Sequence, residues 1–209
     1  MPIILLEGMP GAGKSTILKA IVKKQTNFTL MHEFQFKRKS ISKDYGIYQK
    51  GDLVECNNIK LKELEDKLED SLLESRFQDN SKEFENIKGG LARERIKEME
   101  GYNGIVIRES FFGGLIDKCS EVFLKELIKL LIHVNTIFFL MLDDKELEKR
   151  QKSRIEKRGG KFNDKTNRER NKLFLRQFYE VTERRVKIVY LDARKSVEEL
   201  AEEVIKNLG

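Results

Sequence analysis

The sequence contains few cysteines and no recognisable targeting signal, and both features argue against a secreted, disulfide-stabilised protein. Among 209 residues there are two cysteines, Cys56 and Cys119, which lie far apart and form no metal-binding pattern. We expect two reduced packing residues in a cytoplasmic protein. The first residues contain no basic segment, and Glu7 interrupts the first apolar run, so no secretory leader is expected.

Long apolar runs are also missing. The longest apolar stretch, LLIHVNTIFFLML, is broken by His133, Asn135 and Thr136, which favours a helix end followed by a buried strand over a membrane span. The chain has no internal repeat and no linker rich in proline, glycine or serine. We therefore expect one domain over residues 1–209, without a membrane partner.

The composition indicates a folded chain with anionic partners. Hydrophobic residues make up 39% and charged residues 36%, but the apolar residues form discrete blocks, which argues against disorder. The net charge of +6 favours nucleotides or nucleic acid as partners.

Short apolar runs alternate with longer helical patterns, which predicts an α/β fold with a parallel sheet between two helical layers. The nearly continuous apolar runs are typical of strands covered on both faces. Strands are predicted at residues 2–7, 28–32, 104–108, 136–142 and 186–191, and helices near residues 14–24, 61–75, 81–100, 116–133, 145–158, 167–185 and 197–208. Capping boxes are predicted for the pairs Asp143/Glu146 and Ser196/Glu199. The segment 33–59 is the least regular.

The first predicted strand leads directly into a glycine-rich turn, GMPGAGKST, which satisfies G-x-x-x-x-G-K-[ST] in full. Glycines allow several backbone N–H groups to face one anion, and the next helix adds its N-terminal dipole. Lysine can reach the β/γ-phosphates and serine can ligate Mg²⁺. The predicted triphosphate site comprises Gly8, Met9, Pro10, Gly11, Ala12, Gly13, Lys14, Ser15 and Thr16.

An arginine series follows the fourth predicted strand. Arg150, Arg154 and Arg158 recur every four residues and so line one helical face, and Gly159-Gly160 then breaks the helix. A lid over about residues 144–170 could exclude water and bring guanidinium groups to the transferred phosphoryl, as a kinase requires. The alternative is a solvated helix stabilised by pairs such as Glu146–Arg150.

Two further candidates follow predicted strands, at the sheet edge where parallel sheets bind ligands. Glu33 could accept a proton from the acceptor hydroxyl or hold its sugar. In the run Arg108-Glu109-Ser110, Glu109 could hold Mg²⁺ through water and Arg108 could face phosphate. The alternatives are a surface glutamate and a local ion pair.

The acceptor-side region, about residues 33–100, contains a basic run and several aromatic residues. The basic run, Lys37-Arg38-Lys39, could meet an acceptor phosphate, or could simply be solvated. Four aromatic side chains could stack on a base, or could pack in the core: Phe34, Phe36, Tyr45 and Tyr48. If the acceptor is a neutral nucleoside, Glu33 as base becomes the central residue.

Together the glycine-rich turn, Glu33, the run 108–110, the arginine series and the closing VYLDARKSVEELAEEVIKNL resemble the thymidylate kinase-like superfamily. This group includes thymidylate kinases, other nucleoside monophosphate kinases and deoxynucleoside kinases. The resemblance implies a P-loop NTPase fold with a five-stranded parallel sheet of order 2-3-1-4-5 and ATP–Mg²⁺ as donor. It places the adenine between the lid helix, with Arg154, and the loop that contains Ala193 and Arg194.

The sequence departs from this pattern in the glycine-rich turn and after the third strand. Pro10 replaces the aspartate usual in thymidylate kinases, so the turn is more similar to adenylate and deoxynucleoside kinases. The acid–arginine pair after the third strand occurs in reversed order, as Arg108-Glu109. The acceptor-side arginine is either Arg93 or Arg95.

The leading hypothesis is an ATP-dependent kinase for a nucleoside monophosphate, and the second is a deoxynucleoside kinase. A polynucleotide 5′-kinase is disfavoured because acidic residues are interspersed throughout and no basic stripe with interleaved aromatics occurs. A nucleotide-binding switch ranks last. The acceptor base and the oligomeric state, a homodimer included, remain open.

Overall fold

The computed structural model describes residues 2–25, 27–31, 47–49, 52–54, 58–73, 82–113, 115–116, 119–157 and 159–208. The strands are β1 (Ile3–Gly8), β2 (Thr29–Met31), β3 (Ile47–Gln49), β4 (Asp52–Val54), β5 (Val106–Glu109), β6 (Thr136–Met141) and β7 (Lys187–Asp192). The helices are α1 (Lys14–Lys24), α2 (Ile59–Leu73), α3 (Lys82–Glu100), α4 (Glu121–Leu130), α5 (Asp144–Lys157), α6 (Asp164–Thr182) and α7 (Val197–Lys206), and a 3₁₀ turn covers Leu131–His133.

The strands form one sheet in the order β4-β3-β2-β5-β1-β6-β7. Its five parallel strands, β2-β5-β1-β6-β7, have the predicted order 2-3-1-4-5. The prediction of five strands was incomplete, because β3 and β4 extend the sheet beyond β2 as antiparallel strands. Both lie in the segment 33–59, whose short and polar pattern gave no strand signal.

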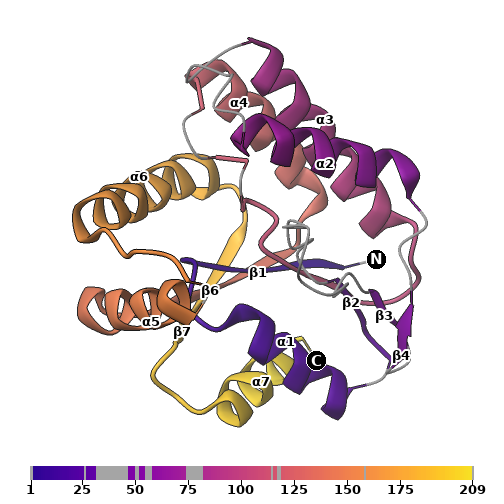
Figure 1. The fold of residues 1–209 in the computed structure, drawn as a ribbon. Helices are drawn as coiled ribbons and strands as arrows, with labels where there is room; N and C mark the ends of the chain where they lie inside the picture. Colours follow the sequence, from indigo (N-terminus) through magenta and orange to yellow (C-terminus); the bar gives the residue numbers. More distant parts are fainter. Residues whose placement is uncertain are drawn as a thin grey trace.

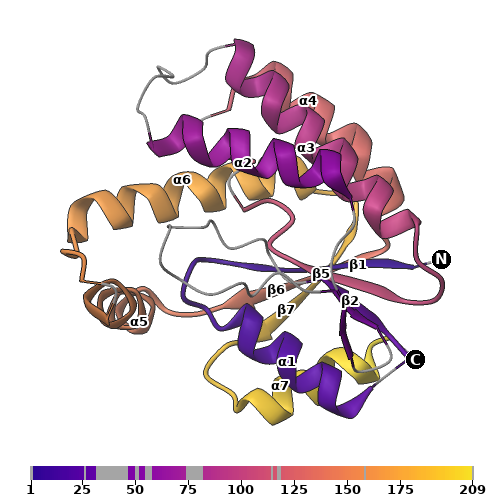
Figure 2. The same ribbon diagram turned by 45° about the vertical axis from the view of Figure 1, so that its right-hand side comes forward.

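Helices cover both faces of the sheet, as Figures 1 and 2 show: α1 and α7 on one face, and α2, α3, α4 and α6 on the other. Successive residues of a strand point to opposite faces, so the two cores divide β1 between them. Leu5 packs in the core under α2, α3, α4 and α6, whereas Leu6 packs in the core under α1 and α7. Helix α5 lies beyond the carboxyl ends of the strands, next to the start of α6 (Figures 1 and 2).

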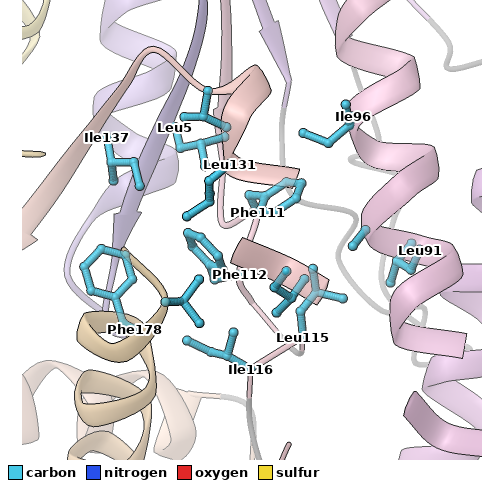
Figure 3. Packing of buried hydrophobic residues seen from close by; sticks show 14 of the residues in the cluster. Leu5, Leu91, Ile96, Phe111, Phe112, Leu115, Ile116, Leu131, Ile137 and Phe178 are labelled. Atoms are coloured by element: carbon cyan, nitrogen blue, oxygen red, sulfur yellow. The ribbon is translucent and has the colours of Figure 1, made fainter. Parts of the chain in front are cut away.

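The helix predicted at 116–133 is present, but its predicted start was wrong. Helix α4 begins only at Glu121, because the Ser120 hydroxyl caps it by accepting a hydrogen bond from the backbone N–H of Phe123. Four apolar residues of the preceding irregular segment are fully buried, and they fill the core between the sheet, α3 and α6 (Figure 3). They are Phe111, Phe112, Leu115 and Ile116. Of these four, only Ile116 lies within the predicted helix, and it is buried in this irregular segment.

The two predicted capping boxes have different outcomes. At α7 the box between Ser196 and Glu199 is complete, which confirms that prediction. At α5 only half of it forms: the Asp143 carboxylate accepts from the Glu146 backbone N–H, but the Glu146 side chain pairs with Arg150. Across the described residues, no helix combines the length and the apolar character that crossing a bilayer requires.

Candidate phosphate-binding site

The glycine-rich turn joins the carboxyl end of β1 to the N-terminus of α1, at the edge of the sheet where ligands bind in such folds. Gly8, Gly11 and Gly13 have φ angles of 147°, 96° and 105°, a region that side-chain-bearing residues rarely adopt. A Cβ at Gly8 would also lie 3.0 Å from the Leu140 carbonyl oxygen of β6. The turn therefore depends on glycine both for its backbone angles and for its close packing on the sheet.

The N-terminus of α1 has the features of an anion site. Gly13 occupies the N-cap position, and no side chain in the described part of the chain caps this helix end. The first turn contains no acidic residue, so the helix dipole and the first N–H groups are not offset locally. Among the described residues, no atom lies within 4 Å of the position that a Cβ at Gly13 would occupy, so the space beside the helix N-cap is open there. These features fit a bound phosphate.

Lys14 projects back over the turn that it follows. Its ammonium group donates hydrogen bonds to the carbonyl oxygens of Gly8, at 2.8 Å, and Met9, at 3.3 Å. The positive charge of Lys14 is thereby held at the mouth of the turn, where it can interact with phosphate oxygens.

Ser15 lies against the carboxyl end of β5. Its hydroxyl donates a hydrogen bond to the Glu109 carboxylate at 3.1 Å, and Glu109 is completely buried. Mg²⁺ is commonly held by one or two oxygen side chains together with phosphate oxygens and water. A hydroxyl and a carboxylate beside a phosphate-binding turn fit that donor set.

The reversed order of Arg108 and Glu109 has a geometric consequence. Adjacent residues of β5 face opposite sides of the sheet, so Glu109 points to the side of α1 while Arg108 points to the side of α2 and α3. The Arg108 guanidinium lies 3.9 Å from the carboxylate of Glu65, on α2. The two side chains therefore lie on opposite faces of the sheet.

Arg95 was one of two candidates for the acceptor-side arginine, and the structure makes it a buried structural group. It is 1% exposed and pairs with Glu65 at 2.8 Å. Its other guanidinium nitrogen donates to the backbone carbonyls of Ser110, Phe111 and Gly113. Arg95 thus fixes the loop after β5, whereas Arg93 on the same helix is exposed.

The loop after β5 is held from the other side as well. The backbone N–H of Phe112 donates to the carboxylate of Glu7, the residue before the glycine-rich turn. Ser110 adopts a left-handed conformation with φ of 52°, which is uncommon for a residue with a side chain. Neither Glu7 nor Glu65 was predicted as a site residue. Glu7 could have been noticed because it is a charged residue within an apolar strand. Nothing in the helical pattern around Glu65 distinguishes that residue from its neighbours.

Helix α5 carries two of the predicted lid arginines. Arg150 pairs with Glu146 at 2.9 Å and donates to the Ala193 carbonyl oxygen at 3.4 Å, so it lies between the lid helix and the loop after β7. Arg154 is exposed one turn further along. Arg158 lies outside the described residues. The neighbour of Arg150, Gln151, was not predicted, yet it is buried and contacts the turn directly.

The loop after β7 brings Ala193 next to the lid helix. Ala193 is buried, and its N–H donates to the Met141 carbonyl oxygen at 2.8 Å. Arg194 instead folds onto Asp192, with nitrogen–oxygen distances of 2.8 and 2.9 Å. This ion pair, together with the Arg194 backbone N–H, lowers the pKa of Asp192 to about 2. In this structure the Arg194 side chain is therefore paired with Asp192.

Most of the predicted acceptor-side residues are not among the described residues. Glu33, Phe34, Phe36, Lys37, Arg38, Lys39 and Tyr45 lie outside the described residues, and Tyr48 belongs to β3. A shallow surface depression lies elsewhere, along α6, and is lined by Asp164, Lys165, Arg168, Glu169 and Lys172. Because all its lining residues come from one helix, we do not assign it to the site.

The sheet order, the glycine-rich turn and the flanking helices define the fold of the P-loop nucleoside and nucleotide kinases. Deoxyadenosine kinase from M. mycoides with products dCMP and dCDP is similar in structure, with a TM-score of 0.53 and 17% identity over 99% of this chain and 97% of that chain. YorR from Bacillus subtilis, in complex with phosphorylated GDP, has a TM-score of 0.54 and 12% identity over 99% and 95% of the two chains. No family model and no curated protein matches the sequence.

Proposed function

We propose that the chain is an ATP-dependent phosphotransferase that phosphorylates a nucleoside monophosphate or a closely related nucleoside. One observation carries the proposal: the glycine turn leads into the N-terminus of α1, which no described side chain caps, beside the hydrogen-bonded pair Ser15–Glu109. When bound, ATP–Mg²⁺ supplies the γ-phosphoryl group and the cation that neutralises its charge. The predicted roles of the other site residues follow from their positions.

The residues of the turn bind and orient the phosphate chain. The N–H groups at the start of α1 and the Lys14 ammonium provide positive charge, while Ser15 and Glu109 would hold Mg²⁺, Glu109 through water. Arg150 lies where it could meet the nucleotide between α5 and the loop at Ala193. Arg154 is exposed, so its proposed phosphoryl contact requires the lid to move toward the turn.

The charge distribution supports a polyanionic substrate. Residues 144–170 contain 11 lysines and arginines against 6 aspartates and glutamates, which is a net +5 of the total +6. The basic surplus is therefore concentrated in the lid and not spread over the surface. Such a field raises the local concentration of anionic ligands and speeds their association at low salt.

The acceptor class has two candidates. A nucleoside monophosphate is favoured by the surplus charge of the lid, because its phosphate adds to the negative charge of the bound triphosphate. A neutral deoxynucleoside is favoured by the similarity to an enzyme named deoxyadenosine kinase. The burial of Arg95 also favours it, because that side chain is occupied by Glu65 and the loop after β5. Glu33 remains the predicted base in this case.

An acceptor panel tests the proposal. The protein is incubated with ATP and Mg²⁺ and with nucleosides, nucleoside monophosphates or a 5′-hydroxyl oligonucleotide, and ADP formation is followed. We expect turnover that depends on a monophosphate, or on a nucleoside for the second candidate, and that is lost in Lys14→Met. Oligonucleotide-dependent turnover would replace the proposal by a polynucleotide kinase. ADP release that is indifferent to every acceptor would indicate a nucleotide-binding switch.

A further inference from the structure

The glycine-rich turn is tied to the lid through one buried carboxamide. Gln151, on α5, is 5% exposed, and its Nε2 donates a hydrogen bond to the Pro10 carbonyl oxygen at 2.8 Å. Pro10 lies within the turn, one residue before Gly11. This contact joins residues 141 positions apart in the sequence.

The same carboxamide is paired with the second lid helix. Gln151 Nε2 also donates to Asn171 Oδ1 at 3.2 Å, and Asn171 Nδ2 donates back to Gln151 Oε1 at 3.3 Å. Nε2 has two hydrogens, so it can serve Pro10 and Asn171 together while Oε1 accepts. The reciprocal pair thus fixes the orientation of the Gln151 amide, with α5, α6 and the turn meeting at one polar group.

Packing reinforces this contact. A Cβ at Gly11 would lie 3.3 Å from Gln151 Cγ, closer than an ordinary van der Waals contact. The backbone of the turn therefore lies directly on the Gln151 side chain, and Gly11 provides the necessary space. Within the turn, the Ala12 N–H donates to the Met9 carbonyl oxygen at 3.1 Å, which closes the bend next to this contact.

A planar trans peptide points its C=O and N–H groups in opposite directions. Because the Pro10 carbonyl points toward Gln151, the Gly11 N–H of the same peptide points away from α5. We propose that Gln151 is a positioning residue that holds this peptide so that the Gly11 N–H faces the bound phosphate chain, with Asn171 holding Gln151. The inference rests on the proposed function for its ligand, but its geometric basis is independent of any activity.

Amide hydrogen exchange of the full-length protein without nucleotide tests the positioning role directly. Gln151→Met keeps the volume of the side chain and removes the donor. We expect exchange at Ala12 to rise about fivefold to tenfold, the effect of losing one buried neutral hydrogen bond. A calorimetric titration should show ATP–Mg²⁺ binding weakened by a similar factor, and any turnover should show a raised KM for ATP with kcat changed less.

Two further variants separate positioning from general loosening. Asn171→Ala should raise exchange at Ala12 by a smaller factor, because Gln151 can still reach Pro10. The double variant should match Gln151→Met alone, since Asn171 acts through Gln151. Gln177→Met, which replaces a buried glutamine on α6, is the matched control and should leave exchange at Ala12 unchanged.

Unchanged exchange at Ala12 in both Gln151→Met and Asn171→Ala would overturn the proposal, as would an equal rise in Gln177→Met. If Gln151→Met does not fold, Asn171→Ala and its control decide the question. If exchange at Ala12 rises but no ATP binding is detected, the contact between Gln151 and Pro10 stands. The proposed role of Gln151 in phosphate binding is then refuted. Because exchange is measured without ATP, absence of kinase activity would count against the proposed function and not against this contact.

Discussion

Arg95→Met removes the charged group that joins α3, α2 and the loop after β5. The guanidinium is 1% exposed and pairs with Glu65, itself 5% exposed, and it binds the carbonyls of Ser110, Phe111 and Gly113. Methionine fills much of the volume but donates no hydrogen bond. The variant would therefore leave a buried carboxylate and buried carbonyl oxygens without this partner.

The expected loss is large because the pair is buried. Removing one partner of a buried ion pair typically destabilises a protein by about 3–5 kcal/mol, mainly because the other charge is left uncompensated. The Arg108 guanidinium, 3.9 Å from Glu65, offsets part of that charge, so we expect about 3 kcal/mol. Whole-domain stabilities are about 5–15 kcal/mol, so the variant should still fold but with a much lower unfolding midpoint.

In denaturant unfolding, this loss of stability appears as a lower midpoint concentration of denaturant with an unchanged m-value. Arg93→Met, on an exposed position of the same helix, is the matched control and should change stability by no more than about 0.5 kcal/mol. The double variant Arg95→Met/Glu65→Leu should recover part of the loss, because it removes the uncompensated carboxylate. A loss below about 1 kcal/mol in Arg95→Met, or a loss equal to that of the control, would refute the assignment of Arg95 as the buried clamp.

Three other outcomes are expected. Glu109→Gln should lower turnover about 10–100-fold and raise the Mg²⁺ concentration needed for half-maximal rate; an unchanged Mg²⁺ dependence would remove Glu109 from the metal site. Arg154→Ala should lower turnover about 10²–10³-fold if its guanidinium stabilises the transferred phosphoryl, while a wild-type rate would exclude it. NMR titration should place the pKa of Asp192 at about 2, moving toward its ordinary value of 3.8 in Arg194→Ala. Because the folded pKa is lowered, this pair stabilises the protein above about pH 4 and loses that effect as the pH falls toward 2.

Much of the fold could be predicted from the sequence, because the apolar runs of β1, β2, β5 and β6 are largely buried on both faces. The glycine-rich turn and the sheet order followed from motif and resemblance, and the observed order 2-3-1-4-5 confirms that prediction. The antiparallel strands β3 and β4 could not be predicted, since strands of three residues give too short a pattern. The helix prediction at 116–133 began too early, at Ile116, because that residue is apolar for packing in the core and not for a helical face.

Only the site residues that lie close together in the sequence could be predicted. Lys14 and Ser15 belong to one contiguous motif, so their placement beside the turn follows from the sequence. The opposite directions of Arg108 and Glu109 could have been inferred from strand alternation once β5 was assigned. Gln151 was not identified, and Arg95 was named only as a candidate acceptor-side arginine, because their contacts are with residues 141 and 30 positions away. Helical spacing shows only that such side chains lie on some face of a helix.

Calorimetric titration of the wild-type protein with a non-hydrolysable ATP analogue, with and without Mg²⁺, tests the central claim most directly. A glycine turn that binds the triphosphate through its N–H groups, Lys14 and Ser15 predicts a saturable, magnesium-dependent heat that is lost in Lys14→Met. No binding heat in the wild-type protein, or an identical titration in the variant, would contradict it.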